Sequence, residues 1–343
     1  MSAPAFELPL RLEAHKPPEA RGLRRDGVRL LVANRGTGLV VHSRVEELPS
    51  FLAPGDLIVV NTSATLPAAL PARRRDGQAL ELRLSTPSPD ESPCRWAVEL
   101  RLGEASFGGA AAGETLELPA GGRAHLLTRY AGSGRLWLAR LELPAPLQQY
   151  LNDHGSPIRY PYVDRAWPLE AYQTAFATDP GSAEMPSAGR PLTAELLARL
   201  AARGVLVAPI TLHTGVSSPE AHESPYPERY WVPEPTARVV NAVHGWSGRV
   251  IAIGTTVVRA LESVAHDDGS VRAGGGWTNV VVTPDRGLRA VDGLLTGWHE
   301  PEASHLQLLR AAAGDELLER SYRAALRHRY LWHEFGDSHL ILP

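Results

Sequence analysis

The chain has 343 residues and a formal net charge of −3, with 43% hydrophobic and 21% charged residues. This composition is typical of a globular protein with a sizeable core, and the length favours two domains. The charge excludes an overall positive field that would attract nucleic acid, so any such binding needs a local arginine patch.

Two residue types that each occur only once exclude several kinds of chemistry. Lys16 is the only lysine, which rules out a phosphate-binding loop of the GxxxxGK[ST] type. Cys94 is the only cysteine, which rules out disulfides within the chain and thiolate metal cages. No apolar run reaches the roughly 18 residues of a membrane span, and the first residues lack the pattern of a secretory signal. We therefore expect a soluble, cytoplasmic protein.

The first elements along the chain predict the start of an α/β body. Residues 29–35 and 40–45 flank a Gly-Thr-Gly turn and predict a β-hairpin. Residues 57–61 form a short β-branched run that ends at Asn61, which is typical of a buried strand.

The pattern then changes twice. From about residue 70 to 144, short strands alternate with Gly- and Pro-rich turns and no helical segment, which predicts a small β-barrel or sandwich. From about residue 145 onward, amphipathic helices alternate with apolar strands, as in α/β proteins. The sequence therefore predicts an α/β body of residues 1–69 and 145–343 with an inserted small β-barrel at residues 70–144.

Polar residues follow predicted strands at three places in the second half of the chain. Because strand ends gather at one edge of an α/β sheet, and new helix N-termini offer free N–H groups, such residues indicate a ligand site. The structural alternatives are a helix-capping threonine, a surface ion pair between Arg259 and Glu262, and an ordinary capped turn at Asp292. The residues expected to converge on one cleft are His213, Gly254, Thr255, Thr256, Arg259, Asp292, Thr296 and His299.

Longer motifs carry a resemblance over nearly the whole chain. They are FELP (6–9), PGDLIVVN (54–61), AYQTAFA (171–177), TLHTG (211–215), GRVIAIGTTVVRALES (248–263), GWTN (276–279), VDGLLT (291–296) and FGD (335–337). In these motifs the chain resembles the S-adenosylmethionine:tRNA ribosyltransferase-isomerase family of queuosine biosynthesis. The resemblance implies an α/β body with an inserted β-barrel, and we expect a monomer.

The resemblance also implies a reaction. The family moves the ribosyl group of S-adenosylmethionine onto 7-aminomethyl-7-deazaguanine in tRNA, forming epoxyqueuosine and releasing adenine and methionine. S-adenosylmethionine is then a consumed substrate, and no metal is expected. The sulfonium acidifies the C5′ protons, so the site needs a base, an acid for adenine and donors for the methionine carboxylate.

Candidate residues exist for each of these roles. The available acid–base groups are His213, His299, Asp292 and Glu262. Arg259, together with the amides of Thr255 and Thr256, is the predicted carboxylate clamp. The other predicted substrate-binding residues are Asn61, Ser187, Gly189, Gly215, Gly254, Gly293, Thr296 and Asp337.

The chain departs from the family pattern mainly at polar positions. Thr62, Ala64 and Ala69 replace an Asp and two Arg, Pro191-Leu192 replaces a His-Phe pair, Glu302 replaces a lysine, and only Glu228 remains of an MHSE stretch. These losses leave two alternatives open: an S-adenosylmethionine-dependent enzyme with a non-tRNA acceptor, and a non-catalytic protein that binds an adenosyl ligand. They also predict weak, salt-dependent tRNA binding, with Arg73–Arg75 as the best local cationic cluster.

Overall fold

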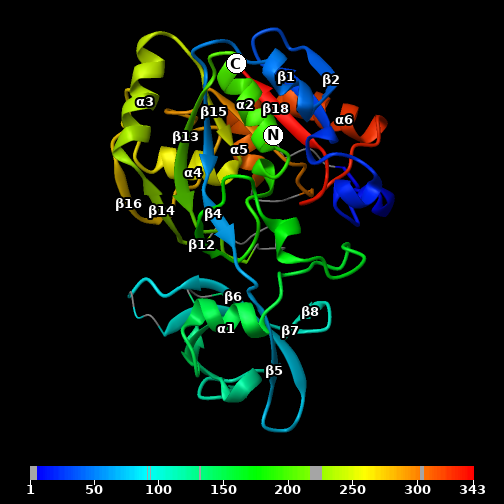
Figure 1. Cartoon of the computed structure of the whole chain (residues 1–343), viewed down its shortest axis with the longest axis vertical. Helices are drawn as coiled ribbons and strands as arrows, with labels where there is room; N and C mark the ends of the chain where they lie inside the picture. Colours follow the sequence, from blue (N-terminus) through cyan, green and yellow to red (C-terminus); the bar gives the residue numbers. More distant parts are fainter. Residues whose placement is uncertain (1–5, 91, 93, 131–132, 217–225, 302–304) are drawn as a thin grey trace.

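The computed structural model describes residues 6–343 except 91, 93, 131–132, 217–225 and 302–304. Its larger part is a nine-stranded sheet in the order β16-β14-β13-β3-β15-β17-β18-β1-β2 (Figure 1). The strands are β1 (Arg29–Asn34), β2 (Val40–Arg44), β3 (Leu57–Asn61), β13 (Leu206–Leu212), β14 (Glu228–Val232), β15 (Val250–Ile253), β16 (Gly274–Thr278), β17 (Gly293–Thr296) and β18 (Ser338–Leu342). β13, β3, β15 and β17 are neighbours and run in parallel, so their carboxyl ends meet at one edge of the sheet.

Helices cover both faces of this sheet because its central strands direct alternate side chains to opposite sides. Val59 and Ala252 pack into one core with α3–α6, whereas Ile58 and Ile251 pack into a second core with α2. The helices are α2 (Ala194–Ala202), α3 (Glu234–Gly245), α4 (Thr255–Glu262), α5 (His305–Ala313) and α6 (Asp315–Arg327). Short 3-10 helices are η1 (Leu10–Leu12), η2 (Pro18–Arg21), η3 (Arg25–Gly27), η4 (Val45–Ser50), η6 (Leu169–Tyr172) and η7 (Ser187–Gly189).

Six antiparallel strands form a closed barrel, which lies below the body in Figure 1. The barrel strands are β5 (Ala69–Arg73), β6 (Ala79–Pro87), β7 (Arg95–Leu102), β9 (Thr115–Glu117), β10 (Arg123–Arg129) and β11 (Leu136–Glu142), with β8 (Ala105–Ser106) beside β7 and η5 (Pro119–Gly121) after β9. Pairing of β11 with β7 closes the ring. The predicted fold class, an α/β body with a small β-barrel, is confirmed.

One helix lies elsewhere than the sequence pattern predicts. α1 (Leu147–His154) falls in the stretch that we assigned to the α/β body. Its Tyr150 and Leu151 are instead buried in the barrel core. The reason is that the apolar face of α1 covers one opening of the barrel, whose small core leaves these side chains a place to pack.

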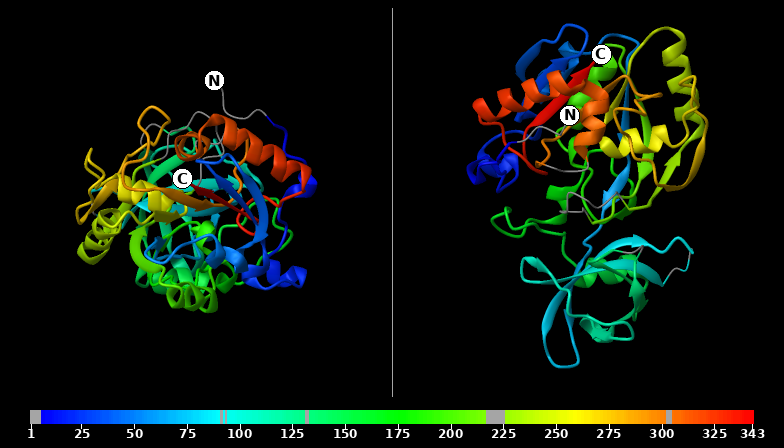
Figure 2. Two further views of the ribbon diagram at one scale, coloured as in Figure 1. Left: turned by 90° about the horizontal axis from the view of Figure 1, so that it is seen from above. Right: turned by 180° about the vertical axis from the view of Figure 1, so that it is seen from behind.

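The chain passes between body and barrel twice, and the two passages lie side by side. β4 (Ser63–Thr65) leads into the barrel, and β12 (Asp179–Ser182) returns from it and pairs with β4 in parallel. Seen from behind in Figure 2, the barrel occupies one end of the long axis, and both termini lie in the body. The linker of residues 155–186 therefore crosses the region between the barrel and the carboxyl edge of the sheet.

Candidate active site

A cavity of about 400 Å³ lies where the carboxyl edge of the sheet meets the linker and the barrel. The ends of β13, β15 and β17 contribute Thr214, Gly254 and Thr296 to its wall, and Thr86 of β6 comes from the barrel. Its size is typical of small-molecule sites, and its position at parallel strand ends is where α/β sheets bind ligands.

The structure divides the predicted site residues into two groups. Those that line the cavity are Ser187, Gly215, Gly254, Thr255, Thr256, Arg259, Thr296 and His299. Those that do not line it are Asn61, Gly189, His213, Glu262, Asp292, Gly293 and Asp337. The expected convergence is therefore correct for the β15–α4 junction and the end of β17, and wrong for His213 and Asp292.

The junction between β15 and α4 presents backbone donors to the cavity. Gly254 has φ 98°, a conformation that side chains disfavour, and a Cβ atom there would touch Ala188 at 3.4 Å. Within the described ranges, no group accepts the first N–H groups of α4, those of Thr255 and Thr256. Asn61 buttresses this turn from behind, because its Nδ2 donates to Leu212 O (2.8 Å) and to Thr256 Oγ1 (3.3 Å). The turn can bind an anionic group.

Arg259, the predicted clamp for a substrate carboxylate, lines the cavity and has a carboxylate partner within the protein. Its Nη1 donates to Glu228 Oε2, and its Nε and Nη2 donate to the carbonyls of Val280 (3.2 Å) and Thr278 (3.3 Å). Glu228 also accepts the Gly215 N–H at 3.1 Å. Burial raises the pKa of Glu228, and the charge of Arg259 opposes that rise. The pair therefore holds α4, β14 and β16 together at the cavity wall.

His299 follows β17 and is held by a neighbouring side chain. Its Nε2 lies 2.9 Å from Thr296 Oγ1, and its ring stacks on His305 with centroids 4.6 Å apart. Burial lowers the pKa of His299 well below the ordinary value, so the imidazole is neutral at pH 7. A neutral imidazole at the cavity wall can accept a proton.

Two tyrosines and two carboxylates from irregular segments also line the cavity, and we call this group the acidic wall: Tyr160, Tyr162, Glu184 and Glu334. Tyr160 Oη donates to Glu184, and Tyr162 Oη donates to Glu334 Oε2 at 2.6 Å. Burial raises the pKa of Glu334 to about 7. Sequence reasoning missed these residues because they follow no strand that the pattern predicted, although Glu334 directly precedes the FGD motif.

His213 is half-buried and does not line the cavity. Its Nδ1 lies 2.7 Å from Ser63 Oγ, and that hydroxyl also contacts Ser182 Oγ at 2.6 Å. Gly181 lets the ring approach, because a Cβ atom there would overlap the imidazole. His213 thus ties β13 to β4 and β12, while its neighbours Thr214 and Gly215 reach the cavity.

Asp292 and Glu262 do not lie at the carboxyl ends of the parallel strands. Each accepts a backbone N–H group elsewhere in the body. Asp292 precedes β17, at the amino edge of the parallel strands, where its Oδ2 accepts the Val250 N–H at 2.8 Å. Gly293 begins the same strand and packs against Ile251. Glu262, near the end of α4, accepts the Arg289 N–H at 2.8 Å and pairs with Arg286, not with Arg259 as the structural alternative proposed.

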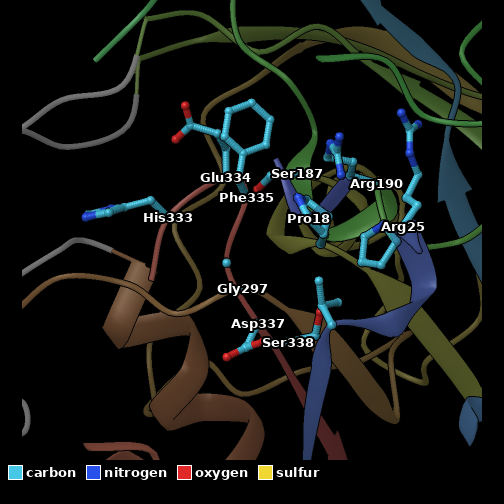
Figure 3. A pocket seen from close by; sticks show the side chains of 14 residues that line it. Pro18, Arg25, Ser187, Arg190, Gly297, His333, Glu334, Phe335, Asp337 and Ser338 are labelled. Carbon is cyan, nitrogen blue, oxygen red and sulfur yellow. The ribbon is translucent and has the colours of Figure 1, made fainter. Parts of the chain in front are cut away.

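Asp337 and Gly189 lie near a much smaller pocket of about 20 Å³, enough for about one water molecule. Asp337 accepts the backbone N–H groups of Arg29 and Leu331, both at 2.8 Å. Gly189 packs against Phe176. Figure 3 shows Glu334 and His333 extending away from Arg190 and Arg25, and Asp337 well separated from Glu334.

Some of the predicted departures from the family pattern concern residues that the structure does not describe. Glu302 and the first two residues of the 224–228 stretch lie outside the described residues. In the part of the chain that is described, no three His, Cys, Asp or Glu side chains are grouped to hold a metal ion. No described helix combines the length and the apolar character needed to cross a membrane.

Comparisons with known proteins agree over nearly the full length. The curated S-adenosylmethionine:tRNA ribosyltransferase-isomerase of Symbiobacterium thermophilum is 38% identical, and the alignment covers 98% of each chain. The Thermus thermophilus and Geobacter sulfurreducens proteins of the same name are 37% and 35% identical, over 96% and 95% of this chain and 97% of each relative.

A solved structure and a protein family match as well. The crystal structure of S-adenosylmethionine tRNA ribosyltransferase from Thermotoga maritima is 30% identical with a TM-score of 0.55, and covers 98% of this chain and 99% of its own. The family described as queuosine biosynthesis protein matches residues 1–341. Together with relatives above 30% identity, this match shows that the chain belongs to the queuosine biosynthesis protein family.

Proposed function

We propose that this protein transfers the ribosyl group of S-adenosylmethionine onto 7-aminomethyl-7-deazaguanine in tRNA, with release of adenine and methionine. One observation carries the proposal: the cavity has two chemically different sides, the free N–H groups of α4 and the acidic wall. S-adenosylmethionine has a carboxylate and a sulfonium, which suit these two sides respectively. The names of the curated relatives support the same activity.

We assign the methionine carboxylate to the amides of Thr255 and Thr256. Arg259 is engaged by Glu228, so the helix N-terminus replaces the guanidinium in this role. Two backbone N–H groups at the start of a helix stabilise an anion without a formal positive charge. Thr296 and Gly254 border the same part of the cavity.

We assign His299 as the base that removes a C5′ proton. The sulfonium makes these protons acidic, and the neutral imidazole is the form that accepts one. Thr296 Oγ1 fixes the ring through the 2.9 Å contact with Nε2. Adenine is then eliminated. The ribosyl group is transferred to the aminomethyl nitrogen of the acceptor, and methionine is released.

The tRNA part of the proposal rests on few cations. In the Arg73–Arg75 cluster, Arg74 pairs with Glu114 at 2.5 Å, which leaves Arg73 and Arg75 exposed. Two exposed charges support weak, salt-dependent binding. We further propose a monomeric, cytoplasmic enzyme, since a modified tRNA base is its acceptor.

Incubation of the protein with S-adenosylmethionine, with and without precursor tRNA, tests this function. We expect adenine and methionine only when tRNA carrying 7-aminomethyl-7-deazaguanine is present. Adenine released without tRNA would favour a different acceptor. No adenine with either would contradict the proposed activity.

A further inference from the structure

The charges in the cavity do not balance. Among the described residues that line it, the carboxylates are Glu184, Glu228, Glu300 and Glu334, and the only guanidinium is Arg259. Arg259 forms an ion pair with Glu228. His299 and His333 do not compensate, since burial lowers the pKa of both, that of His333 to about 4. Among the described lining residues, no arginine therefore remains to pair with Glu334.

Glu334 is the carboxylate best placed to meet a ligand. Tyr162 Oη donates to its Oε2 at 2.6 Å, and the backbone N–H of Glu334 itself also donates to the carboxylate. Arg190 does not neutralise it, because the Arg190 guanidinium donates to Glu19 (3.0 Å) and to Ala171 O (2.8 Å). Figure 3 shows Glu334 reaching away from Arg190. Glu334 is thus oriented by Tyr162 and by its own backbone, and no described arginine forms an ion pair with it.

Aromatic rings border this carboxylate. The rings of Tyr160 and Tyr162 stack with centroids 5.7 Å apart, and Tyr162 stacks on His333 at 3.8 Å. Tyr172 lines the same cavity. Electron-rich ring faces beside a carboxylate are the surroundings that proteins use for sulfonium and ammonium groups, since the ring quadrupole and the full charge both attract a cation.

We propose that Glu334, oriented by Tyr162 and bordered by the stacked rings, binds the positively charged sulfur or nitrogen of a substrate. The raised pKa of Glu334 agrees with this role, because a bound cation removes the cost of burying the unpaired carboxylate. The inference rests on the proposed function for its two cation sources, the sulfonium of S-adenosylmethionine and the aminomethyl group of the acceptor base.

Calorimetry with matched ligand pairs tests the proposal without requiring turnover. The first pair is S-adenosylmethionine and S-adenosylhomocysteine, which differ by the sulfonium methyl group and its charge. The second pair is the free bases 7-aminomethyl- and 7-cyano-7-deazaguanine, which differ by the amine. In one pair we expect the wild type to prefer the cation about tenfold, and Glu334→Gln to reduce that preference to less than about twofold while the neutral ligand binds as before.

The pair that loses its preference identifies which cation Glu334 binds. Tyr162→Phe removes only the orienting hydroxyl and should weaken the same preference by about threefold, which supplies a second reading if Glu334→Gln folds poorly. Glu47→Gln makes the same charge change at an exposed position outside the cavity and is the matched control. Unchanged preference in both pairs for Glu334→Gln and Tyr162→Phe would overturn the inference.

The outcome separates this inference from the proposed function. If the preference for the cation depends on Glu334 but no adenine is released in the presence of tRNA, the cation-binding role of Glu334 is supported and the proposed reaction is contradicted. If adenine is released in the presence of tRNA and Glu334→Gln keeps its preference for the cation, the proposed reaction is supported and the cation-binding role of Glu334 is contradicted.

Discussion

The two walls of the cavity show opposite ways of handling charge. At the wall formed by the start of α4 and its neighbours, which we call the α4 wall, the buried carboxylate of Glu228 pairs with Arg259. The carbonyls of Thr278 and Val280 accept further hydrogen bonds from the Arg259 guanidinium. At the acidic wall, Glu334 has a tyrosine but no cation. A charge that the protein satisfies internally holds elements together, whereas one left unsatisfied remains available to a ligand. We therefore expect the Arg259–Glu228 pair to govern stability and Glu334 to govern the binding of a cation.

The strongest test of this contrast removes Arg259. The side chains of Arg259 and Glu228 are only 10% and 14% exposed, so Arg259→Ala leaves a buried carboxylate without its partner. We expect a loss of about 3 kcal/mol in the free energy of unfolding, measured by urea denaturation. Adding Glu228→Gln should restore part of this loss, because the unpaired charge is then gone. A change below about 1 kcal/mol would mean that the pair does not hold the wall.

Glu334→Gln should act in the opposite direction. The pKa of Glu334 is raised from 4.5 to about 7 by burial, so its ionisation opposes folding above about pH 4.5, and the cost is complete above about pH 7. The neighbouring charges are Glu184, which adds to the rise, and Arg190, which reduces it. We expect the variant to be more stable than wild type by roughly 1–3 kcal/mol at pH 8 and equal to it at pH 4.

Urea denaturation at the two pH values measures this difference. Glu47→Gln serves as the control because it removes the same charge from an exposed side chain outside the cavity. Equal stability of wild type and Glu334→Gln at pH 8 would show that the carboxylate has a counter-charge after all.

Gly254→Ala tests the backbone of the α4 wall. The residue has φ 98°, and a Cβ atom would lie 3.4 Å from Ala188 and 3.5 Å from Thr256 Oγ1, which are ordinary contacts. Strain in the backbone is therefore the main cost, about 1–2 kcal/mol in the free energy of unfolding. We also expect weaker S-adenosylmethionine binding, since relief of the strain would turn the Thr255 and Thr256 amides. Unchanged calorimetric affinity would separate these amides from the ligand.

Asp292→Ala should have the smallest effect and separates the structure from the sequence prediction. The side chain accepts the Val250 N–H at the amino edge of the sheet and is 38% exposed, so its loss should cost about 1 kcal/mol or less. The rate of adenine release should stay within about twofold of wild type, measured under saturating substrate. A hundredfold slower rate of adenine release in a normally folded variant would show that Asp292 takes part in the reaction.

Local pattern was enough to predict the architecture. The change from short strands to alternating helices and strands is a property of neighbouring residues, as is the buried run Leu57–Asn61. The β15–α4 junction was predictable for the same reason, because an apolar run, a glycine and two threonines specify a strand, a sharp turn and a helix start. Such signals need no knowledge of the partner elements.

The positions of Asp292 and His213 needed more than local pattern. Both adjoin predicted strands, but Asp292 precedes its strand and His213 turns toward β4 and β12, so neither reaches the cavity. Which end of a strand faces a ligand depends on the direction in which neighbouring strands run. That direction is set by pairings between segments far apart in the chain.

The sequence by itself determined the fold class, the absence of a GxxxxGK[ST] loop and of disulfides within the chain, and the three strand ends from which the cavity wall is built. Only the tertiary structure decided which charges are paired. Arg259 meets Glu228 from 31 residues away, and Tyr162 meets Glu334 from 172 residues away. Electrostatic pairing depends on distance in space and on burial, and long-range packing sets both, so the acidic wall became recognisable only once the chain was folded.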